Sequence, residues 1–191
     1  MTTRIGDNKT GPECELVNND HHVAYFKRIV NGYFRNNVNS QFPGALPVSL
    51  ERRDFHKLKT YEYSVTEKTD GIRYFMLITK HKDEQIALMI DRKYNFYKFF
   101  IYSENNIEQY FDNSLFDGEL IKKNDGSWAF YIHDCIACCG ENVGKKYLYD
   151  RLENVKEFVG KNIECDFEIT TKDIVQYTPD NINELSEKIK E

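Results

Sequence analysis

The chain has 191 residues, which fits one domain and is long enough to bury a core. Tyr and Phe contribute 13 residues each, a composition that favours a β-rich globular protein over a disordered one. The formal net charge of −5 excludes a polycation that holds nucleic acid by bulk electrostatics, so any RNA contact must be local. No apolar run approaches the length of a membrane span, and we expect no membrane partner.

The first part of the chain is polar and loosely patterned. Residues 1–20 contain two glycines and a proline among polar residues, which predicts a loose leader. Residues 23–38 carry apolar side chains at helical spacing and predict a helix. Residues 42–49 hold two prolines and a glycine, which indicate an ordered loop or an extended segment. We therefore predict a leader followed by one partial domain over 21–191.

The rest of the chain is rich in predicted strands. The Asn-Asp-Gly sequence at 124–126 predicts a tight hairpin between two of them. Amphipathic spacing predicts helices at 145–158 and 181–191, and because the second has no capping signal we expect a chain cut inside a larger protein. This is an α+β pattern of mainly antiparallel sheets with flanking helices. Alternation and apolar runs predict strands at 61–67, 72–79, 86–91, 94–101, 115–122, 128–138 and 163–170.

A lysine, Lys68, lies between two predicted strands and is followed by Asp70, Gly71 and Arg73. An amine in this setting can attack phosphorus once its pKa is lowered by desolvation or by a neighbouring cation, such as Arg73 or a bound divalent metal. Gly71 would let the backbone turn tightly near a phosphate or sugar, and Asp70 would fix the shape of the loop. The alternative is an ordinary hairpin turn, because Asp-Gly is a common turn dipeptide.

With these residues in place, the chain resembles the superfamily of DNA ligases, RNA ligases and mRNA capping enzymes. The segment KTDGIR at 68–73 is similar to its first motif, Lys-x-Asp-Gly-x-Arg, whose lysine forms a covalent lysyl-nucleotide. The sequence FDGEL places Glu119 in the third motif, near the nucleotide sugar and metal. The strand ending at Asp134 resembles the next motif, with His133 where Phe is usual, so that purine stacking passes to Phe130.

Flanking segments resemble capping enzymes, particularly those of large DNA viruses. FPGALPVSLER precedes the lysine as it does there, and ALMIDRKYNFYKF resembles a hairpin that brings Arg92 near substrate phosphates or sugar. The resemblance covers residues 42–175 and implies an ATP-grasp-like nucleotidyltransferase fold. It also implies GTP as donor and a diphosphate or triphosphate RNA 5′ end as acceptor. Mg²⁺ or Mn²⁺ would be held by oxygen ligands, with Glu119 as the metal-site candidate. The expected nucleotide-binding residues are Thr69, Asp70, Gly71, Arg73, Arg92, Glu119, Phe130 and Lys172.

Two later motifs of the family, and its OB-fold domain, have no counterpart in the sequence. Lys172 matches only the lysine-containing strand that precedes the fourth motif. We therefore expect the fragment alone to bind GTP poorly and to be inactive. The missing C-terminal part is its expected partner.

Other chemistry-bearing residues have plainer explanations. A structural zinc site needs about four ligands, and we expect Cys135 and Cys138 to face opposite sides of a strand, so buried free thiols are favoured over a metal. His21 and His22 lie in the polar leader and are read as solvated. His133 either touches the purine edge or fills the core.

Two other functions stay open at this point. An ATP-dependent RNA or DNA ligase would use the same lysine chemistry, and donor preference would separate it from a capping enzyme. An inactive nucleotidyltransferase fold acting as a binding or assembly module would predict no effect of changing Lys68. The intact Lys68, Arg73 and Glu119 argue against that module. The odd number of cysteines, five, and the viral resemblance predict a cytoplasmic location.

Overall fold

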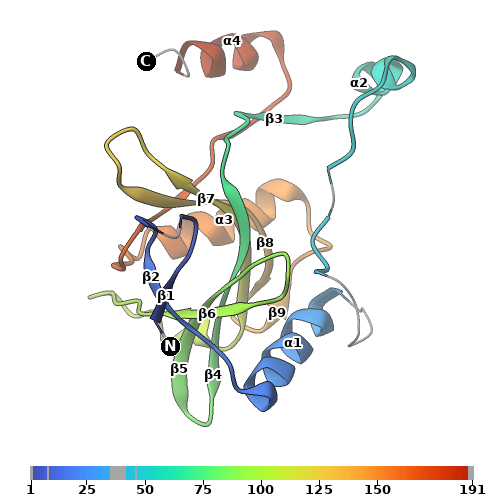
Figure 1. Ribbon diagram of the computed structural model, residues 1–191. Helices are drawn as coiled ribbons and strands as arrows, with labels where there is room; N and C mark the ends of the chain where they lie inside the picture. The colour runs from blue at the N-terminus through green and yellow to red at the C-terminus, as the bar shows by residue number, and fades with distance from the viewer. Residues whose placement is uncertain (1, 8, 35–41, 46, 189–191) are drawn as a thin grey trace. The chain divides into compact units, whose positions relative to one another are not determined.

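The computed structural model describes residues 2–7, 9–34, 42–45 and 47–188 (Figure 1). The chain divides into two compact units. The first comprises residues 1–43 and 70–171, and the second comprises residues 44–69 and 172–191. The predicted lysine loop therefore lies where the chain passes from the second unit back into the first.

The first unit is built on one nine-stranded sheet (Figure 1). All of its named pairings are antiparallel except that of β10 with β8, which is parallel. The Asn-Asp-Gly hairpin between β7 and β8 is confirmed, with Gly126 at φ +85°. The strand order is β1 (Thr2–Arg4), β2 (Glu13–Leu16), β6 (Phe96–Phe99), β5 (Glu84–Ile90), β4 (Ile72–His81), β7 (Ser114–Lys122), β8 (Trp128–Cys138) and β10 (Glu168–Thr171), with β9 (Glu141–Asn142) beside β8.

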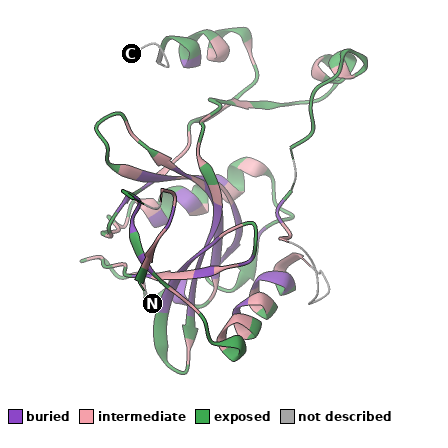
Figure 2. Ribbon diagram, viewed as in Figure 1, coloured by how far each residue is buried: buried purple, intermediate pink, exposed green. Residues whose placement is uncertain are grey.

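Helices cover both faces of this sheet, which explains the continuous apolar run of β4. Helix α1 (Asp20–Phe34) packs Phe26 and Val30 into one core cluster with Phe75 of β4. Helix α3 (Leu148–Val159) packs Phe158 against Phe116 of β7, with ring centroids 4.8 Å apart. Because Met76, the neighbour of Phe75, is the cross-strand partner of Phe116, the two helices lie on opposite faces. The purple strands of Figure 2 show this two-sided burial.

The loose leader predicted for residues 1–20 is wrong in the structure. Strands β1 and β2 lie within it, and β2 pairs with β6 at one side of the sheet. Cys14 and Ile5 are only 4% and 2% exposed, whereas Glu13 and Glu15 alternate outward. Polarity misled the prediction because an outer strand buries one row of side chains and leaves the other row in solvent.

The other element bounds differ from the predictions mainly at their ends. Helix α1 starts three residues earlier than predicted, where Asn19 Oδ1 accepts the backbone N–H groups of His21 (3.0 Å) and His22 (3.1 Å). Its predicted last residues, 35–38, lie outside the described residues. A short 3₁₀ helix, η2 (Glu108–Phe111), precedes β7 and was not predicted.

The second unit contains one small sheet and three helical segments. Strand β3 (Ser64–Thr66) pairs antiparallel with β11 (Ile174–Gln176). A 3₁₀ turn, η1 (Arg52–Asp54), leads into helix α2 (Phe55–Thr60), which the sequence pattern did not predict. Helix α4 (Pro179–Lys188) corresponds to the helix expected at 181–191. The α+β class with mainly antiparallel sheet is confirmed.

Candidate active site

The lysine segment is not the hairpin turn of the plainer explanation. Strand β3 pairs with β11, whereas β4 pairs with β5 and β7, so the two strands that flank Lys68 are not partners. Residues 67–71 form neither helix, strand nor hydrogen-bonded turn, and Lys68 is exposed. A nucleophilic lysine must be able to approach the phosphorus that it attacks, and an exposed side chain in an irregular segment allows this approach.

In the second unit, Lys172 lies beside the residue that follows Lys68. Its ammonium donates a hydrogen bond to Thr69 Oγ1 at 2.9 Å, across 103 residues of sequence. The backbone carbonyl of Asp173 accepts a hydrogen bond from Thr66 Oγ1 at 2.7 Å. The pairing of β3 with β11 thus brings the two predicted residues Thr69 and Lys172 together and places the Lys172 ammonium against the residue that follows Lys68.

In the first unit, Gly71 is needed for close strand approach rather than for a left-handed turn. A Cβ added to it would lie 2.8 Å from Ile121 Cγ1 and 2.9 Å from the Cβ of Glu119. The backbone of β4 can therefore begin against β7 only with glycine at this position. Two residues from separate motifs, Gly71 and Glu119, are therefore in close contact.

A cavity of about 390 Å³ in the first unit gathers several of the predicted residues. Arg73 and Glu119 are direct cross-strand partners on β4 and β7, so their side chains share one face of the sheet. The turn between β5 and β6 contributes Arg92 and Lys93 to the same cavity. The lining holds three cations, Arg73, Arg92 and Lys93, and two carboxylates, Asp91 and Glu119. This set suits a ligand that carries phosphates and a hydroxylated sugar.

Asp91, which the sequence analysis did not single out, holds the turn that carries these cations. Its Oδ1 accepts the backbone N–H groups of Lys93 (2.8 Å) and Asn95 (2.9 Å). Its Oδ2 accepts the Asn95 side-chain amide at 2.8 Å and the Tyr97 hydroxyl at 3.0 Å. The signal in the sequence was an aspartate at the start of a turn, where its side chain can cap the following backbone.

Arg73 forms a bidentate ion pair with Asp117, a partner that the motif comparison did not predict. Its Nε donates to Asp117 Oδ1 at 2.8 Å and its Nη2 donates to Oδ2. Their side chains are only 12% and 8% exposed. Burial raises the pKa of Asp117, but hydrogen bonds from Arg73 and His133 outweigh it and hold that pKa below its usual value. The hydrogen bond to Asp117 raises the pKa of Arg73 in turn.

His133 reaches Asp117 because it occupies a β-bulge. Gly118 pairs with Ile132 and Asp117 pairs with Asp134, which leaves His133 without a partner on β7. Its Nε2 lies 3.5 Å from Asp117 Oδ1, and its side chain is 27% exposed. The bulge therefore turns this ring toward the carboxylate that anchors Arg73.

Phe130, the residue expected to stack on a purine, is fully buried. Its ring lies beneath the backbone of β7, where a Cβ on Gly118 would come within 2.6 Å of Phe130 Cζ. A ring that stacks on a base must expose a face, so the stacking role expected for Phe130 does not fit its position. Tyr131 and His133 are the partly exposed rings of this motif. The β-bulge next to Ile132 leaves His133 partly exposed.

We expect Gly118→Ala to destabilise the protein by about 2 kcal/mol, because a Cβ would also lie 2.6 Å from the Tyr131 carbonyl oxygen, which is backbone and cannot move aside. The matched control is Gly32→Ala in α1, where nothing lies within 4 Å of the added Cβ. Alanine there should leave stability unchanged or raise it by about 0.5–1 kcal/mol. Urea unfolding of both variants would measure the difference, and equal effects would contradict the close packing at Gly118.

No group of three or more His, Cys, Asp or Glu side chains among the described residues is arranged to hold a metal ion. Mg²⁺ often binds through one or two carboxylates together with substrate phosphates, so a cage made only of protein is not required. Glu119, which lines the cavity, is the residue that fits such a role. The metal requirement stays a prediction.

All five cysteines carry free thiols. The expectation that Cys135 and Cys138 face opposite sides is wrong, because Ile136 forms a second bulge in β8 and the two thiols interact. Cys138 and Cys139 have their sulfur atoms 3.7 Å apart.

His22, expected to be solvated, packs edge-on against His81 at 4.9 Å between ring centroids.

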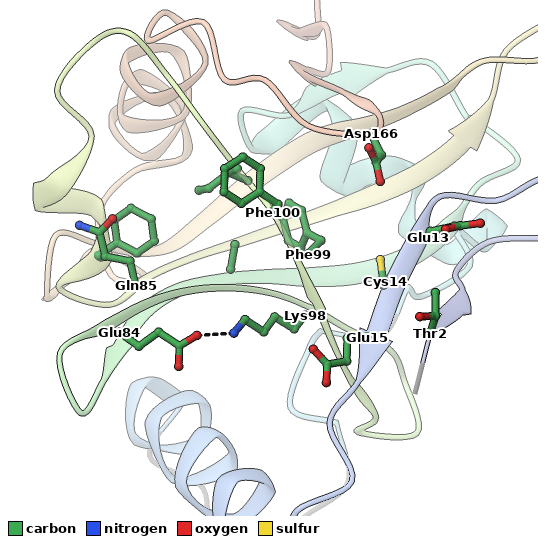
Figure 3. A pocket seen from close by; sticks show the side chains of 13 residues that line it. Thr2, Glu13, Cys14, Glu15, Glu84, Gln85, Lys98, Phe99, Phe100 and Asp166 are labelled. Carbon is green, nitrogen blue, oxygen red and sulfur yellow. Dashed lines mark hydrogen bonds and ion pairs between the residues drawn. The ribbon is translucent and has the colours of Figure 1, made fainter.

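Another cavity, of about 510 Å³, has the wrong charge for a nucleotide (Figure 3). It lies over β2, β5 and β6, and one cation, Lys98, is among its lining residues. Lys98 is paired with Glu84, as the dashed line in Figure 3 shows. Four carboxylates line this cavity and would repel phosphates: Glu13, Glu15, Glu84 and Asp166.

Comparison with known proteins identifies the family. The model of the "mRNA capping enzyme, catalytic domain" matches residues 11–185, and the chain belongs to this family. The mRNA-capping enzyme subunit alpha of Kluyveromyces lactis is 32% identical over 174 residues, which cover 81% of this chain and 37% of that protein. The subunit alpha of Schizosaccharomyces pombe is 35% identical over 123 residues, covering 58% and 31%. The mRNA-capping enzyme of Danio rerio is 33% identical over 129 residues, covering 65% and 22%.

The chain thus spans about a third or less of the length of these relatives. Among the residues that the structure describes, no helix combines the length and the apolar character needed to cross a membrane. The family assignment confirms the capping-enzyme resemblance, while the reported relatives are fungal and vertebrate proteins rather than viral ones.

Proposed function

We propose that the protein is an mRNA guanylyltransferase that transfers GMP from GTP, through a covalent adduct on Lys68, to the 5′ end of a diphosphate RNA. The observation that carries this proposal is the cavity in which Arg73, Arg92 and Glu119 converge. The first residue in the chain that lines this cavity is Gly71, three residues after the exposed Lys68. Membership of the capping-enzyme family supports GTP as the donor and RNA as the acceptor.

The reaction has two displacements at the α-phosphorus. In the first, the neutral amine of Lys68 attacks the α-phosphorus of GTP, a P–N bond forms, the bond to the bridging oxygen breaks and pyrophosphate leaves. The attacking amine loses a proton. In the second, a terminal oxygen of the RNA 5′-diphosphate attacks the same phosphorus, the P–N bond breaks, and the lysine amine leaves with a proton. Both steps depend on positioning and on neutralising phosphate charge.

The residues of the first unit have separate roles in this proposal. Arg92 binds phosphate oxygens from a turn that Asp91 holds rigid. Arg73 lines the cavity and is held in place by Asp117, so it can meet a phosphate with little further loss of side-chain freedom. Glu119 accepts a ribose hydroxyl or contributes to binding Mg²⁺ or Mn²⁺, which would supply charge neutralisation at the phosphates.

We expect Arg92→Ala to raise the KM for GTP by about tenfold or more, because it removes hydrogen bonds between a cation and phosphate oxygens. Folding should be unaffected, since Arg92 is an exposed turn residue. The matched control is Arg28→Ala on α1, whose guanidinium lies over the Tyr25 ring at 5.6 Å and not in the cavity. Steady-state formation of the labelled adduct at varied GTP concentrations would measure both. An unchanged KM in Arg92→Ala would exclude Arg92 from nucleotide binding.

Donor choice tests the proposed function. The full-length protein would be incubated with α-labelled GTP or ATP in the presence of Mg²⁺ or Mn²⁺ and then denatured. The proposal predicts label from GTP only, stable in alkali and labile in acid, as a phosphoramidate is. Label from ATP alone would assign the protein to the ligases, and label from neither nucleotide would favour the inactive module.

Three finer points belong to the same proposal. The flanking segments FPGALPVSLER and ALMIDRKYNFYKF support a capping enzyme of the large-DNA-virus type. Five free thiols support a reducing compartment, and hence a cytoplasmic location. A further C-terminal part with an OB-fold domain would complete the enzyme and close over the nucleotide.

A further inference from the structure

A second feature of the chain combines cations with exposed aromatic rings. Residues 52–63, here the basic-aromatic segment, contain Arg52, Arg53, Lys57 and Lys59. Asp54 and Glu62 are its only acidic residues, so the segment carries a net charge of +2 in a chain whose formal charge is −5. The segment comprises η1, α2 and the chain leading into β3, all within the second unit.

The aromatic rings of this segment are exposed to solvent. Phe55 is 54% exposed, Tyr61 is 64% exposed and Tyr63 is 36% exposed. No residue of η1 or α2 is buried, and Figure 2 shows α2 drawn as exposed with intermediate patches. Exposed aromatic rings lose the free energy of burial, so three within nine residues indicate a surface that binds something.

Helical spacing arranges part of the segment as a strip. Residues three apart are eclipsed in a 3₁₀ turn, and residues four apart are neighbours on an α-helix. Arg52, Phe55 and Lys59 follow this spacing, so a cation lies on each side of one exposed ring. Tyr61 and Tyr63 continue the aromatic series in the extended chain toward β3.

The ion pairs within this region are too exposed to hold its cations strongly. Arg53 Nε lies 3.0 Å from Glu51, with the two side chains 78% and 58% exposed. Lys57 Nζ lies 2.6 Å from Asp54. Ion pairs in solvent contribute little free energy, so the phosphates of a ligand can compete for these lysine and arginine side chains.

We propose that the basic-aromatic segment binds the single-stranded RNA chain that follows the 5′ end, with the cations on phosphates and the exposed rings stacked on bases. This inference rests on the proposed function, because it assigns a surface to the RNA acceptor. Alternating cations and aromatic rings are the usual means of holding single strands without sequence preference. An anionic membrane is a poorer fit, because α2 has only six residues and its exposed surface is not divided into polar and apolar faces.

The test uses the full-length protein and a short single-stranded 5′-diphosphate RNA. The first variant, Arg52→Ala with Lys59→Ala, removes two cations. The second, Phe55→Ala, removes one ring. Arg52→Lys with Lys59→Arg preserves the charges, and Lys145→Ala with Lys156→Ala removes two exposed cations of the first unit as the matched control. RNA affinity would be measured at several salt concentrations, and adduct formation from GTP would be measured separately.

The cation variant should bind RNA about tenfold more weakly and lower the slope of log affinity against log salt by about 1.4, the value for two phosphate contacts on a single strand. Phe55→Ala should weaken binding by about tenfold with an unchanged salt slope. All variants should form the adduct with GTP at the rate of the unmodified protein, and the charge-preserving and first-unit variants should bind RNA normally.

Unchanged RNA binding in the first two variants would overturn the inference. Equal losses in the matched control would also overturn it. Failure of the unmodified protein to form an adduct would count against the proposed function instead, because RNA binding is measured without GTP.

Discussion

Lys68→Ala is expected to abolish covalent labelling of the protein by α-labelled GTP. The side chain supplies the only atom that bonds to phosphorus in the proposed first step, so we expect a loss of about 10⁴-fold or more. Lys68→Arg should be equally inactive, because a guanidinium is not deprotonated at neutral pH and cannot attack. The measurement is adduct formed per minute on a denaturing gel.

The control for this loss is Lys172→Ala. Lys172 donates a hydrogen bond to Oγ1 of Thr69, the residue that follows Lys68 in the sequence. The Lys172→Ala substitution should reduce the rate of labelling, but the adduct should still form on Lys68. Labelling that persists in Lys68→Ala at the level of the unmodified protein would remove Lys68 from the chemistry altogether.

Asp117→Ala is expected to destabilise the protein by about 3–5 kcal/mol. It leaves the Arg73 guanidinium buried without its bidentate partner, and such a loss costs far more than the pair itself contributes. Asp112→Ala is the matched control, because its carboxylate pairs with Lys80 of the same strand, β4, at 3.1 Å but is 61% exposed. That substitution should cost under about 1 kcal/mol. Urea unfolding would measure both variants.

The same ion pair predicts how stability changes with pH. The pKa of Asp117 is lower in the folded protein than in the unfolded chain, so the charged carboxylate favours folding. Its contribution is fully present above the unfolded pKa of about 3.9 and is lost as pH falls through the folded pKa. The stability difference between the unmodified protein and Asp117→Asn should therefore be constant from neutral pH to about pH 5 and shrink in stronger acid. A difference that grows in acid would contradict this assignment.

Local signals in the sequence predicted the central strands well, because their side-chain patterns follow from burial alone. The apolar run of β4 and the hairpin at Gly126 are of this kind. The strands of the first twenty residues were not predicted, because most of their side chains are polar and solvent-exposed and only a few, such as Cys14, are buried. Helix α2 was missed for a related reason, because a six-residue exposed helix has no apolar face to detect.

For the site, motif order named Arg73, Arg92 and Glu119, which line one cavity, but it did not predict how these residues are paired. The cross-strand register that places Arg73 opposite Glu119 depends on long-range pairing, which spacing does not encode. The bulges at His133 and Ile136 could not be predicted from the alternation of side chains. Each bulge inserts one residue and thereby reverses which face of the sheet the following side chains point to. The bulge at His133 explains why Asp117 has His133 as a neighbour.

The most direct test of the central claim is to locate the bound nucleotide. The full-length protein would be incubated with GTP and a divalent metal, digested at neutral to alkaline pH, and its peptides examined by mass spectrometry. We predict one peptide that carries a GMP adduct, with the modification on Lys68. The absence of any adduct, or an adduct on another lysine such as Lys172, would contradict the assignment of Lys68 as the nucleophile.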